Sequence, residues 1–338
     1  MVVNKVRAQR NRTLTLNCGE TERYSKDLIH ISKPAVVNTF KNTIVNQDTF
    51  EALTFLPEKF VDLLIVDPPY NLTKTFNSTT FRKKSIARYA EWLEKLMVKL
   101  LPTLKNTASV YVCSEWYSST AVHLVLDKLL KVRNRITWER EKGRGAKRNF
   151  KNASEDIWFA TVSDDYVFNV ENIKLKRRVL APYTDTNGEP KDWLNTSDGQ
   201  FRLTHPSNLW NDITVPFWSM PENTDHPTQK PEKLLAKLIL ASTNENDFVF
   251  DPFMGVGSSL VAAKKLNRKF LGLEIETEYC LLAAKRLHLA ELDMTIQGYS
   301  DGVFWERNTL KGQKQKTKTP VASTRRSKNT LSSQTLIL

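Results

Sequence analysis

The sequence predicts an α/β fold built on a doubly wound, mostly parallel sheet, with one inserted region. Nearly continuous apolar runs, such as residues 61–66, are typical of strands buried on both faces of a parallel sheet. Segments with helical spacing of apolar residues alternate with these runs, and one of them, residues 89–101, is followed directly by Pro102. A glycine-containing turn at residues 255–257 joins an apolar run to a helical segment, which favours the same fold class.

Each expected element follows from the same patterns. The expected strands are residues 43–45, 61–66, 108–113, 135–138, 155–162, 247–250 and 270–275. The expected helices are residues 49–56, 89–101, 123–130, 231–242, 255–266 and 279–292. The composition divides the chain into a polar, loosely ordered arm (1–42), a first half of the core (43–163), an insertion rich in Asn, Asp, Pro and Trp (164–222), a second half of the core (223–308) and a basic tail expected to be disordered (309–338).

The 338-residue chain is strongly basic, with a formal net charge of +13. This charge favours an anionic partner, either nucleic acid or a membrane surface, although solubility alone would also account for it. No apolar run approaches the roughly 18 residues that a membrane span needs, so we expect no membrane segment. The three cysteines and five histidines show no metal-ligand spacing, so we expect no structural metal.

The glycine turn, Asp251-Pro252-Phe253-Met254-Gly255-Val256-Gly257-Ser258-Ser259, is typical of sites where backbone approaches a ligand closely. Glu274 ends the next expected strand, at a distance that suits hydrogen bonds to ribose hydroxyls. A plain tight turn would look the same. A dinucleotide is disfavoured, because Leu260 occupies the position of the third glycine in dinucleotide-binding proteins.

Asp67-Pro68-Pro69-Tyr70 directly follows the buried run of residues 61–66. The exocyclic amino group of a base is a poor nucleophile, because its lone pair is conjugated into the ring. A carboxylate and a proline carbonyl that accept its two hydrogens would localise this lone pair, and the stiff Pro-Pro unit would hold them in place beforehand. Tyr70 would stack on a base that has left the helix. A strand-ending turn is the alternative interpretation of this tetrapeptide.

The two motifs together resemble the amino-methyltransferases of DNA in the β arrangement, where a DPPY-type motif precedes the target-recognition region and the cofactor motif. Residues 226–231 (His-Pro-Thr-Gln-Lys-Pro) also resemble an element of that family, and Gly272-Leu273-Glu274 followed by Tyr279 resembles its ribose-binding element. The family commonly has Gly-Ser-Gly-Thr-Thr where this chain has Gly255-Val256-Gly257-Ser258-Ser259, with hydroxyls kept at the last two positions.

The resemblance implies a Rossmann-like methyltransferase that uses S-adenosylmethionine, with residues 43–163 as the catalytic half, 164–222 as the target-recognition region and 223–308 as the cofactor-binding half. The implied catalytic residues are Asp67, Pro68, Pro69 and Tyr70. The implied cofactor-binding residues are Asp48, Asp67, His226, Thr228, Gln229, Lys230, Asp251, Pro252, Phe253, Gly255, Gly257, Ser258, Ser259 and Glu274.

Asp67 at the first position of the catalytic motif resembles the adenine-N6 enzymes, whereas cytosine-N4 enzymes more often have Ser there. A cytosine-N4 enzyme and a noncatalytic DNA-binding regulator on the same fold remain alternatives. A nicotinamide-dependent oxidoreductase would use the glycine turn but leaves residues 67–70 unexplained. Cytosine-C5 methylation is excluded, because it needs a cysteine nucleophile, typically after proline, and no cysteine follows a proline here.

Two basic segments are expected to contact DNA phosphates. The expected DNA-binding residues are Lys142, Arg144, Lys147 and Arg148, in a glycine-containing loop that also holds Arg140 and Lys151, and Lys83 and Lys84 beside the catalytic motif. Solvated charged loops are the alternative interpretation. The tryptophans of the insertion, Trp193, Trp210 and Trp218, are expected to form a small core of their own.

Double-stranded DNA is the expected partner. The resemblance leaves open whether the chain acts as a monomer or a homodimer, and whether it is paired with a restriction endonuclease or acts alone. With no membrane segment expected, it implies a cytoplasmic, nucleoid-associated protein of a bacterium, an archaeon or a phage.

Overall fold

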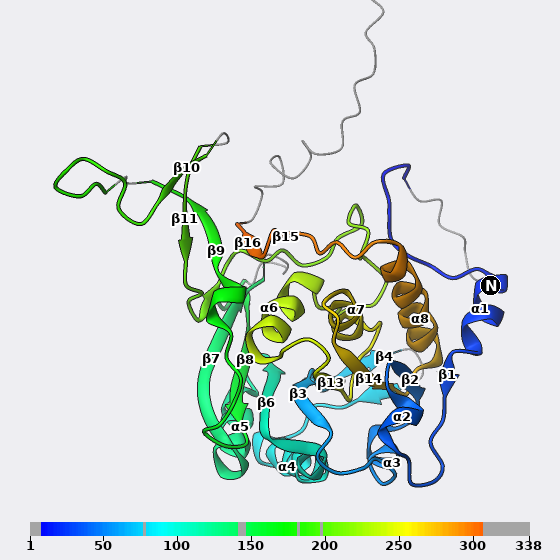
Figure 1. The fold of residues 1–338 in the computed structure, drawn as a ribbon. Coiled ribbons are helices and arrows are strands. Elements are labelled where there is room, and N and C mark those ends of the chain that lie inside the picture. Colours follow the sequence, from blue (N-terminus) through cyan, green and yellow to red (C-terminus); the bar gives the residue numbers. More distant parts are fainter. Residues whose placement is uncertain (1–7, 77–78, 141–146, 181–182, 197–198, 307–338) are drawn as a thin grey trace, which may run out of the picture.

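A large, twisted sheet forms the centre of the protein (Figure 1). The computed structural model describes residues 8–76, 79–140, 147–180, 183–196 and 199–306. Within these residues the sheet has nine strands, in the order β1-β2-β14-β13-β3-β6-β8-β7-β12. In that spatial order the strands are Leu28–Ile29, Thr43–Asn46, Lys269–Glu274, Phe248–Asp251, Val61–Val66, Leu104–Ser114, Ser154–Thr161, Lys131–Glu139 and Leu209–Trp210. Only β8 runs antiparallel to its neighbours, which confirms the mostly parallel α/β sheet predicted from the apolar runs.

Helices cover both faces of the sheet, so that the fold is doubly wound. Alternate residues of β3 illustrate this: Leu63 and Ile65 pack into one apolar cluster, and Leu64 and Val66 into the other. The first cluster includes α6, α7 and α8, and the second includes α2 to α5 (Figure 1). The helices are α1 (Cys18–Ser25), α2 (Val37–Phe40), α3 (Thr49–Ala52), α4 (Ile86–Leu100), α5 (Ser119–Leu129), α6 (Glu232–Ser242), α7 (Ser258–Lys265) and α8 (Thr277–Leu292), with 3-10 turns at Leu101–Thr103 and Val170–Ile173.

The polar amino-terminal arm is more ordered than its composition predicts. Asn17 caps α1 with a capping box, in which its side chain accepts from Glu20 N–H and the Glu20 carboxylate accepts from Asn17 N–H. Tyr24 of α1 is buried, and its ring lies 6.3 Å from that of His288 on α8. β1 then adds a parallel strand to the edge of the sheet beside β2. The expectation of a loosely ordered arm is therefore wrong for residues 17–40.

A small hairpin follows the Asp67–Tyr70 motif. It pairs β4 (Lys74–Phe76) with β5 (Thr79–Phe81), and α4 begins soon after it at Ile86. Ser85 caps α4 by accepting a hydrogen bond from Arg88 N–H. This hairpin places Lys74, Thr80 and Phe81 beside the catalytic motif.

The insertion forms most of a second sheet, which projects from the body (Figure 1). Its strands, in spatial order, are β10 (Leu194–Thr196), β11 (Gly199–Thr204), β9 (Leu175–Arg178), β16 (Val303–Trp305) and β15 (Tyr299–Ser300). β9 therefore lies between β11 and β16, a strand from the carboxyl-terminal part of the chain. The last strand of the insertion, β12, instead joins the edge of the large sheet beside β7.

The tryptophans of the insertion do not form a core of their own. Trp210 is buried, but it packs with the apolar cluster of the large sheet. Trp193 is half-buried, and Trp218 is 51% exposed. The expectation of a small tryptophan core is wrong, because β12 belongs to the large sheet rather than to the projecting one.

Candidate active site

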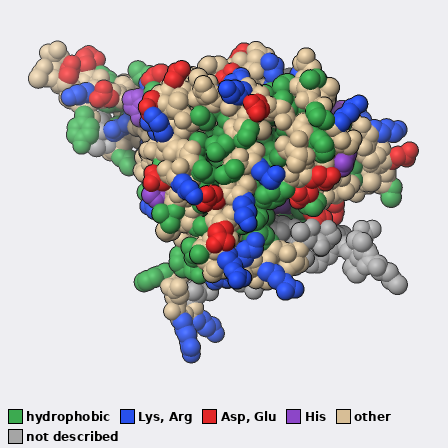
Figure 2. Space-filling model, turned by 90° about the horizontal axis from the view of Figure 1, so that it is seen from below, with side chains coloured by type: hydrophobic (Ala, Val, Ile, Leu, Met, Phe, Trp, Pro, Cys, Tyr) green, Lys and Arg blue, Asp and Glu red, His purple; other side chains and the backbone are tan. Residues whose placement is uncertain are grey.

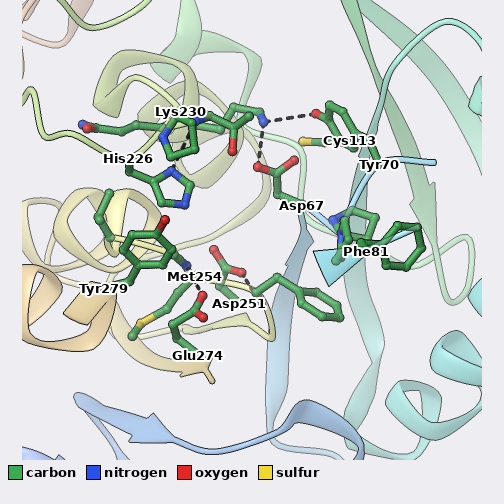
Figure 3. A pocket seen from close by; sticks show the side chains of 18 of the residues that line it. Asp67, Tyr70, Phe81, Cys113, His226, Lys230, Asp251, Met254, Glu274 and Tyr279 are labelled. Atoms are coloured by element: carbon green, nitrogen blue, oxygen red, sulfur yellow. Dashed lines mark hydrogen bonds and ion pairs between the residues drawn. The ribbon is translucent and has the colours of Figure 1, made fainter. Parts of the chain in front are cut away.

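A cavity of about 510 Å³ opens at the carboxyl ends of β3, β13 and β14. Parallel strands bring these ends to the same edge of the sheet, which is where α/β folds place ligands. Asp67, Asp251 and Glu274, which follow or end these three strands, all line the cavity (Figure 3). Two segments separated by more than 180 residues of chain thus share one cavity, and its volume is typical of sites for drug-sized molecules.

Only one of the two carboxylate oxygens of Asp67 has a hydrogen-bond partner among the described residues. The Nζ atom of Lys230 donates to its Oδ2 atom over 2.6 Å (Figure 3). The Oδ1 atom is buried and has no hydrogen-bond partner among the described residues. A buried carboxylate oxygen without a partner is costly, so this atom is suited to accept a hydrogen bond from a ligand.

Lys230 is the charge partner of two carboxylates. Its side chain is only 7% exposed, and Nζ also lies 3.4 Å from Oε2 of Glu155. Burial alone would lower the pKa of Lys230, but the carboxylates of Asp67 and Glu155 outweigh it and hold this pKa above its ordinary value. The lysine therefore stays a cation inside the cavity.

Tyr70 is fixed by hydrogen bonds at its hydroxyl. This hydroxyl donates to Glu155 Oε2 over 3.1 Å and accepts from Lys230 Nζ over 3.1 Å. Burial raises the pKa of Tyr70 well above its ordinary value, and the charges of Asp67 and Glu155 raise it further. The neutral phenol thus presents a fixed aromatic ring at the cavity wall. The carbonyl of Pro69 accepts from the Tyr89 hydroxyl over 3.2 Å, which anchors the stiff tetrapeptide to α4.

Glu155 and Arg140 complete the cavity wall. The sequence suggests residues 152–155 as a cradle for the rotated base, but it does not predict that Glu155 pairs with Arg140. Arg140 was grouped with the DNA-contacting loop, but its guanidinium donates to Glu155, whose side chain is only 2% exposed. Both residues line the cavity together with Asn152. The sequence signal for Glu155 is weak: it lies within β8 and is buried, like Ile157 and Phe159 two and four residues further along the strand.

The glycine turn wraps around Asp251. Its Oδ1 atom accepts from Phe253 N–H over 3.0 Å, and the hydroxyl of Ser259 donates to Oδ2. Burial raises the pKa of Asp251 from its ordinary 3.8 to about 7. Glu274 closes the opposite side, because its Oε2 accepts from Gly255 N–H over 3.1 Å. Burial also raises the pKa of Glu274.

The two glycines have different surroundings. Gly255 lines the cavity at φ +54°, and a Cβ there would lie 3.2 Å from Nε2 of His226. Gly257 precedes α7 at φ +71° and lies outside the cavity lining, where a Cβ would come within 2.8 Å of the Ala283 Cβ on α8. Gly255 therefore permits close approach to the cavity, and Gly257 permits close packing of α7 on α8.

The loop before α6 contributes His226, Thr228, Gln229 and Lys230 to the cavity lining. Burial lowers the pKa of His226 to about 3, and the charge of Lys230 contributes, so the imidazole is neutral. Its ring packs edge-on against Tyr279, with 4.5 Å between the centroids. The Gln229 amide is engaged within the loop: it accepts from Thr224 and donates to the Glu222 carbonyl.

The other predicted cofactor residues occupy three kinds of position. Asp48 lies at the exposed rim of the cavity, where its side chain caps α3. Pro252 does not line the cavity, and its carbonyl accepts from the Thr49 hydroxyl over 2.6 Å. Phe253, Ser258 and Ser259 line the cavity.

The predicted DNA-binding residues that the structure describes do not line the cavity. Lys142 and Arg144 lie outside the described residues. Lys147 and Arg148 are exposed. Lys83 stacks over the ring of Tyr117 at 4.2 Å, and Lys84 lies over Phe81 and Trp92. Figure 2 shows Lys and Arg side chains gathered along the lower part of one face, some of them on a projecting segment.

In the parts of the chain that the structure describes, no group of three or more His, Cys, Asp or Glu side chains is arranged to hold a metal ion. A membrane-crossing helix needs a long apolar stretch, and no helix in the described ranges has one.

The chain is similar in sequence and in fold to several known proteins. The family described as DNA methylase matches residues 61–285 of the chain. The DNA adenine methyltransferase YhdJ of Escherichia coli (strain K12) is 32% identical over 256 residues, which are 73% of this chain and 83% of that protein. The type II methyltransferase M.BglII of Bacillus subtilis is 31% identical over 252 residues, which are 72% of this chain and 68% of that protein. The PvuII DNA methyltransferase (cytosine-N4-specific) has a similar fold, with a TM-score of 0.55 at 17% identity over 77% of this chain and 88% of that chain.

Proposed function

Because the chain belongs to the N6/N4 DNA methylase family, we propose that it transfers a methyl group from S-adenosylmethionine to adenine N6 in double-stranded DNA. The observation that carries this proposal is the buried Oδ1 atom of Asp67, which has no partner among the described residues. It is the acceptor that an amino group entering the cavity requires.

The cavity fits S-adenosylmethionine by volume and by charge. Glu274 ends β14 at the cavity, where its carboxylate would accept from ribose hydroxyls. Asp251 and the Gly255 backbone line the adjoining wall, and the neutral His226 adds no positive charge there. When bound, S-adenosylmethionine supplies a methyl group on a positively charged sulfur.

The residues at the other end of the cavity would prepare the acceptor. Asp67 Oδ1 accepts one hydrogen of the amino group and the Pro68 carbonyl accepts the other, which localises the nitrogen lone pair. Lys230 holds Oδ2, so that the carboxylate keeps its orientation. Tyr70, fixed through Glu155 and Lys230, stacks on the base.

The projecting sheet, with β9, β10 and β11, would contact the duplex around the target base. Its strands contribute Lys176, Arg177, Arg178 and Arg202 to a surface that lies outside the large sheet. Basic residues on such a surface suit phosphate contacts, and the intervening side chains would read base edges.

Adenine is favoured over cytosine by Asp67 at the first position of the motif and by the similarity to YhdJ, a DNA adenine methyltransferase. Cytosine N4 is the second candidate, because the PvuII methyltransferase has a similar fold and is cytosine-N4-specific. Digestion of methylated DNA followed by chromatography of the nucleosides separates the two. N6-methyl-2′-deoxyadenosine supports the proposal, and N4-methyl-2′-deoxycytidine would replace it with the second candidate.

The catalytic assignment is tested by replacing Asp67 with Ala. Transfer of a radiolabelled methyl group to duplex DNA should fall by at least about a hundredfold, because the acceptor of the amino hydrogen is lost. Binding of S-adenosylmethionine, measured by calorimetry, should stay within about threefold, because Glu274 and Asp251 are unchanged. Asp127→Ala, at an exposed position of α5, is the matched control. Wild-type rates for the Asp67 variant would refute the assignment.

A further inference from the structure

Phe150 is 96% exposed, more than any other large hydrophobic side chain that the structure describes. Its phenyl ring therefore contributes nothing to the core of the protein. A large apolar side chain held in water in this way is suited to burial against a partner.

The loop that carries Phe150 rises from the mouth of the cavity. β7 and β8 form its base, where Glu139 is paired with Ser154, and Arg140 N–H donates to the Ala153 carbonyl over 2.6 Å. Arg140 and Asn152, one on each arm of the loop, both line the cavity. Asn152 is only two residues beyond Phe150, so the two Cα atoms lie within about 7 Å of each other.

The residues flanking Phe150 are cationic. Lys147, Arg148 and Lys151 are exposed, and none of them forms an ion pair with another described residue. An aromatic ring surrounded by free cations suits a partner with a charged surface and a stacked aromatic interior. Duplex DNA has both, with phosphates outside and bases within.

We propose that Phe150 inserts into the base stack of the duplex and fills the space left when the target nucleotide rotates into the cavity. This inference rests on the proposed function. Rotation of a base out of the helix costs unstacking and unpairing, and an inserted aromatic ring restores part of the lost stacking. The loop base holds Phe150 beside the cavity, so that insertion and capture of the base occur at the same position along the duplex.

The experiment compares two DNA duplexes that contain the recognition sequence, identified beforehand by sequencing DNA methylated by the wild-type protein. In one duplex the target base is paired, and in the other it lies opposite an abasic site, so that its rotation costs less. Wild type, Phe150→Ala and Phe150→Trp are assayed for kcat/KM on both. Leu292→Ala, which removes another highly exposed apolar side chain at the end of α8, is the matched control.

Phe150→Ala should lower kcat/KM on the paired duplex by about tenfold or more, and should stay within about twofold of wild type on the duplex with the abasic site. Phe150→Trp should keep most of the activity on both duplexes, and Leu292→Ala should match the wild type. The proposal is overturned if Phe150→Ala is as active as wild type on the paired duplex, or if it loses equally on both duplexes. If the preliminary sequencing detects no DNA methylated by the wild type, the proposed function is refuted instead.

Discussion

Lys230 and Asp67 lie 163 positions apart in the chain, yet Nζ of the lysine is 2.6 Å from Oδ2 of the aspartate. This ion pair joins the loop before α6 to the tetrapeptide after β3, and so connects the two halves of the cavity. Glu155, from a third segment, lies 3.4 Å from the same Nζ atom. One ammonium group thus orients two acidic side chains that come from distant parts of the chain.

Replacement of Lys230 by Met should lower the free energy of unfolding by about 3 kcal/mol, because the half-buried Asp67 loses its ammonium partner and the buried Glu155 keeps only Arg140 as a charge partner. Urea denaturation without ligand measures this change. Lys128→Met is the matched control: its ion pair with Glu94 is exposed, so the loss should be below about 1 kcal/mol. Equal effects of the two substitutions would contradict the buried, bridging role of Lys230.

Asp251 should make the stability of the ligand-free protein depend on pH. Its pKa is raised from 3.8 to about 7 by burial, so the folded state binds a proton more tightly than the unfolded state does. The stabilisation is fully present below pH 3.8 and is lost as the pH rises through about 7. Asp251→Asn lacks this dependence.

Urea denaturation should therefore show the wild type losing stability relative to Asp251→Asn between about pH 5 and pH 7, by up to about 1.4 kcal/mol per pH unit, with little further loss above about pH 7. If the difference in the free energy of unfolding between the two proteins is constant over this pH range, the pKa of Asp251 is not raised in the folded state.

Gly257→Ala should destabilise the protein by about 1–3 kcal/mol, because the added Cβ would lie 2.8 Å from the Ala283 Cβ. Gly302→Ala is the matched control: Gly302 has a similar φ of +76° with no atom within 4 Å, so only backbone strain of about 1 kcal/mol applies. Ala283→Gly alone should cost about 1 kcal/mol, because glycine is unfavourable inside a helix. The double variant Gly257→Ala, Ala283→Gly should therefore be less destabilised than the sum of its two single substitutions. Thermal denaturation measures the wild type and the four variants, and strictly additive effects would rule out the contact.

Simultaneous replacement of Lys147 and Arg148 by Ala should weaken binding to duplex DNA without regard to sequence. If each contacts one phosphate, the slope of log K against log salt should become shallower by about 0.9 per residue. Fluorescence anisotropy at several salt concentrations measures the slope. Lys99→Ala, an exposed lysine near the end of α4, should leave it unchanged. An unaltered slope in the double variant would place the phosphate contacts elsewhere.

The central strands were predictable because burial on both faces requires a continuous apolar run, as in residues 61–66, which form β3 over the same bounds. The shared cavity was predictable because such strands end at one edge of the sheet. Strands of two or three residues are too short to carry such a signal, so β1, β4 and β5 were missed. Their positions depend on the edges and loops that they contact.

Within the site, the motifs predicted which segments meet. They did not predict which side chains face the cavity and which pack or pair within the protein. Gly257 matches a ligand-binding pattern, yet its neighbour is Ala283 of α8. Arg140 belongs to a basic loop by sequence, but it is paired with Glu155 in the cavity. Such distinctions depend on contacts between residues far apart in the chain, which local sequence patterns do not record.

The pairing of β16 with β9 has a consequence for protein engineering. Phe304 and Trp305 lie opposite Leu175 and Lys176, and the Lys176 ammonium lies 4.3 Å from the Trp305 ring centroid. A chimera that received only residues 164–222 from a relative would leave the edge of β9 to pair with a foreign strand or with none. Transplantation of this module therefore needs residues 299–305 from the same donor.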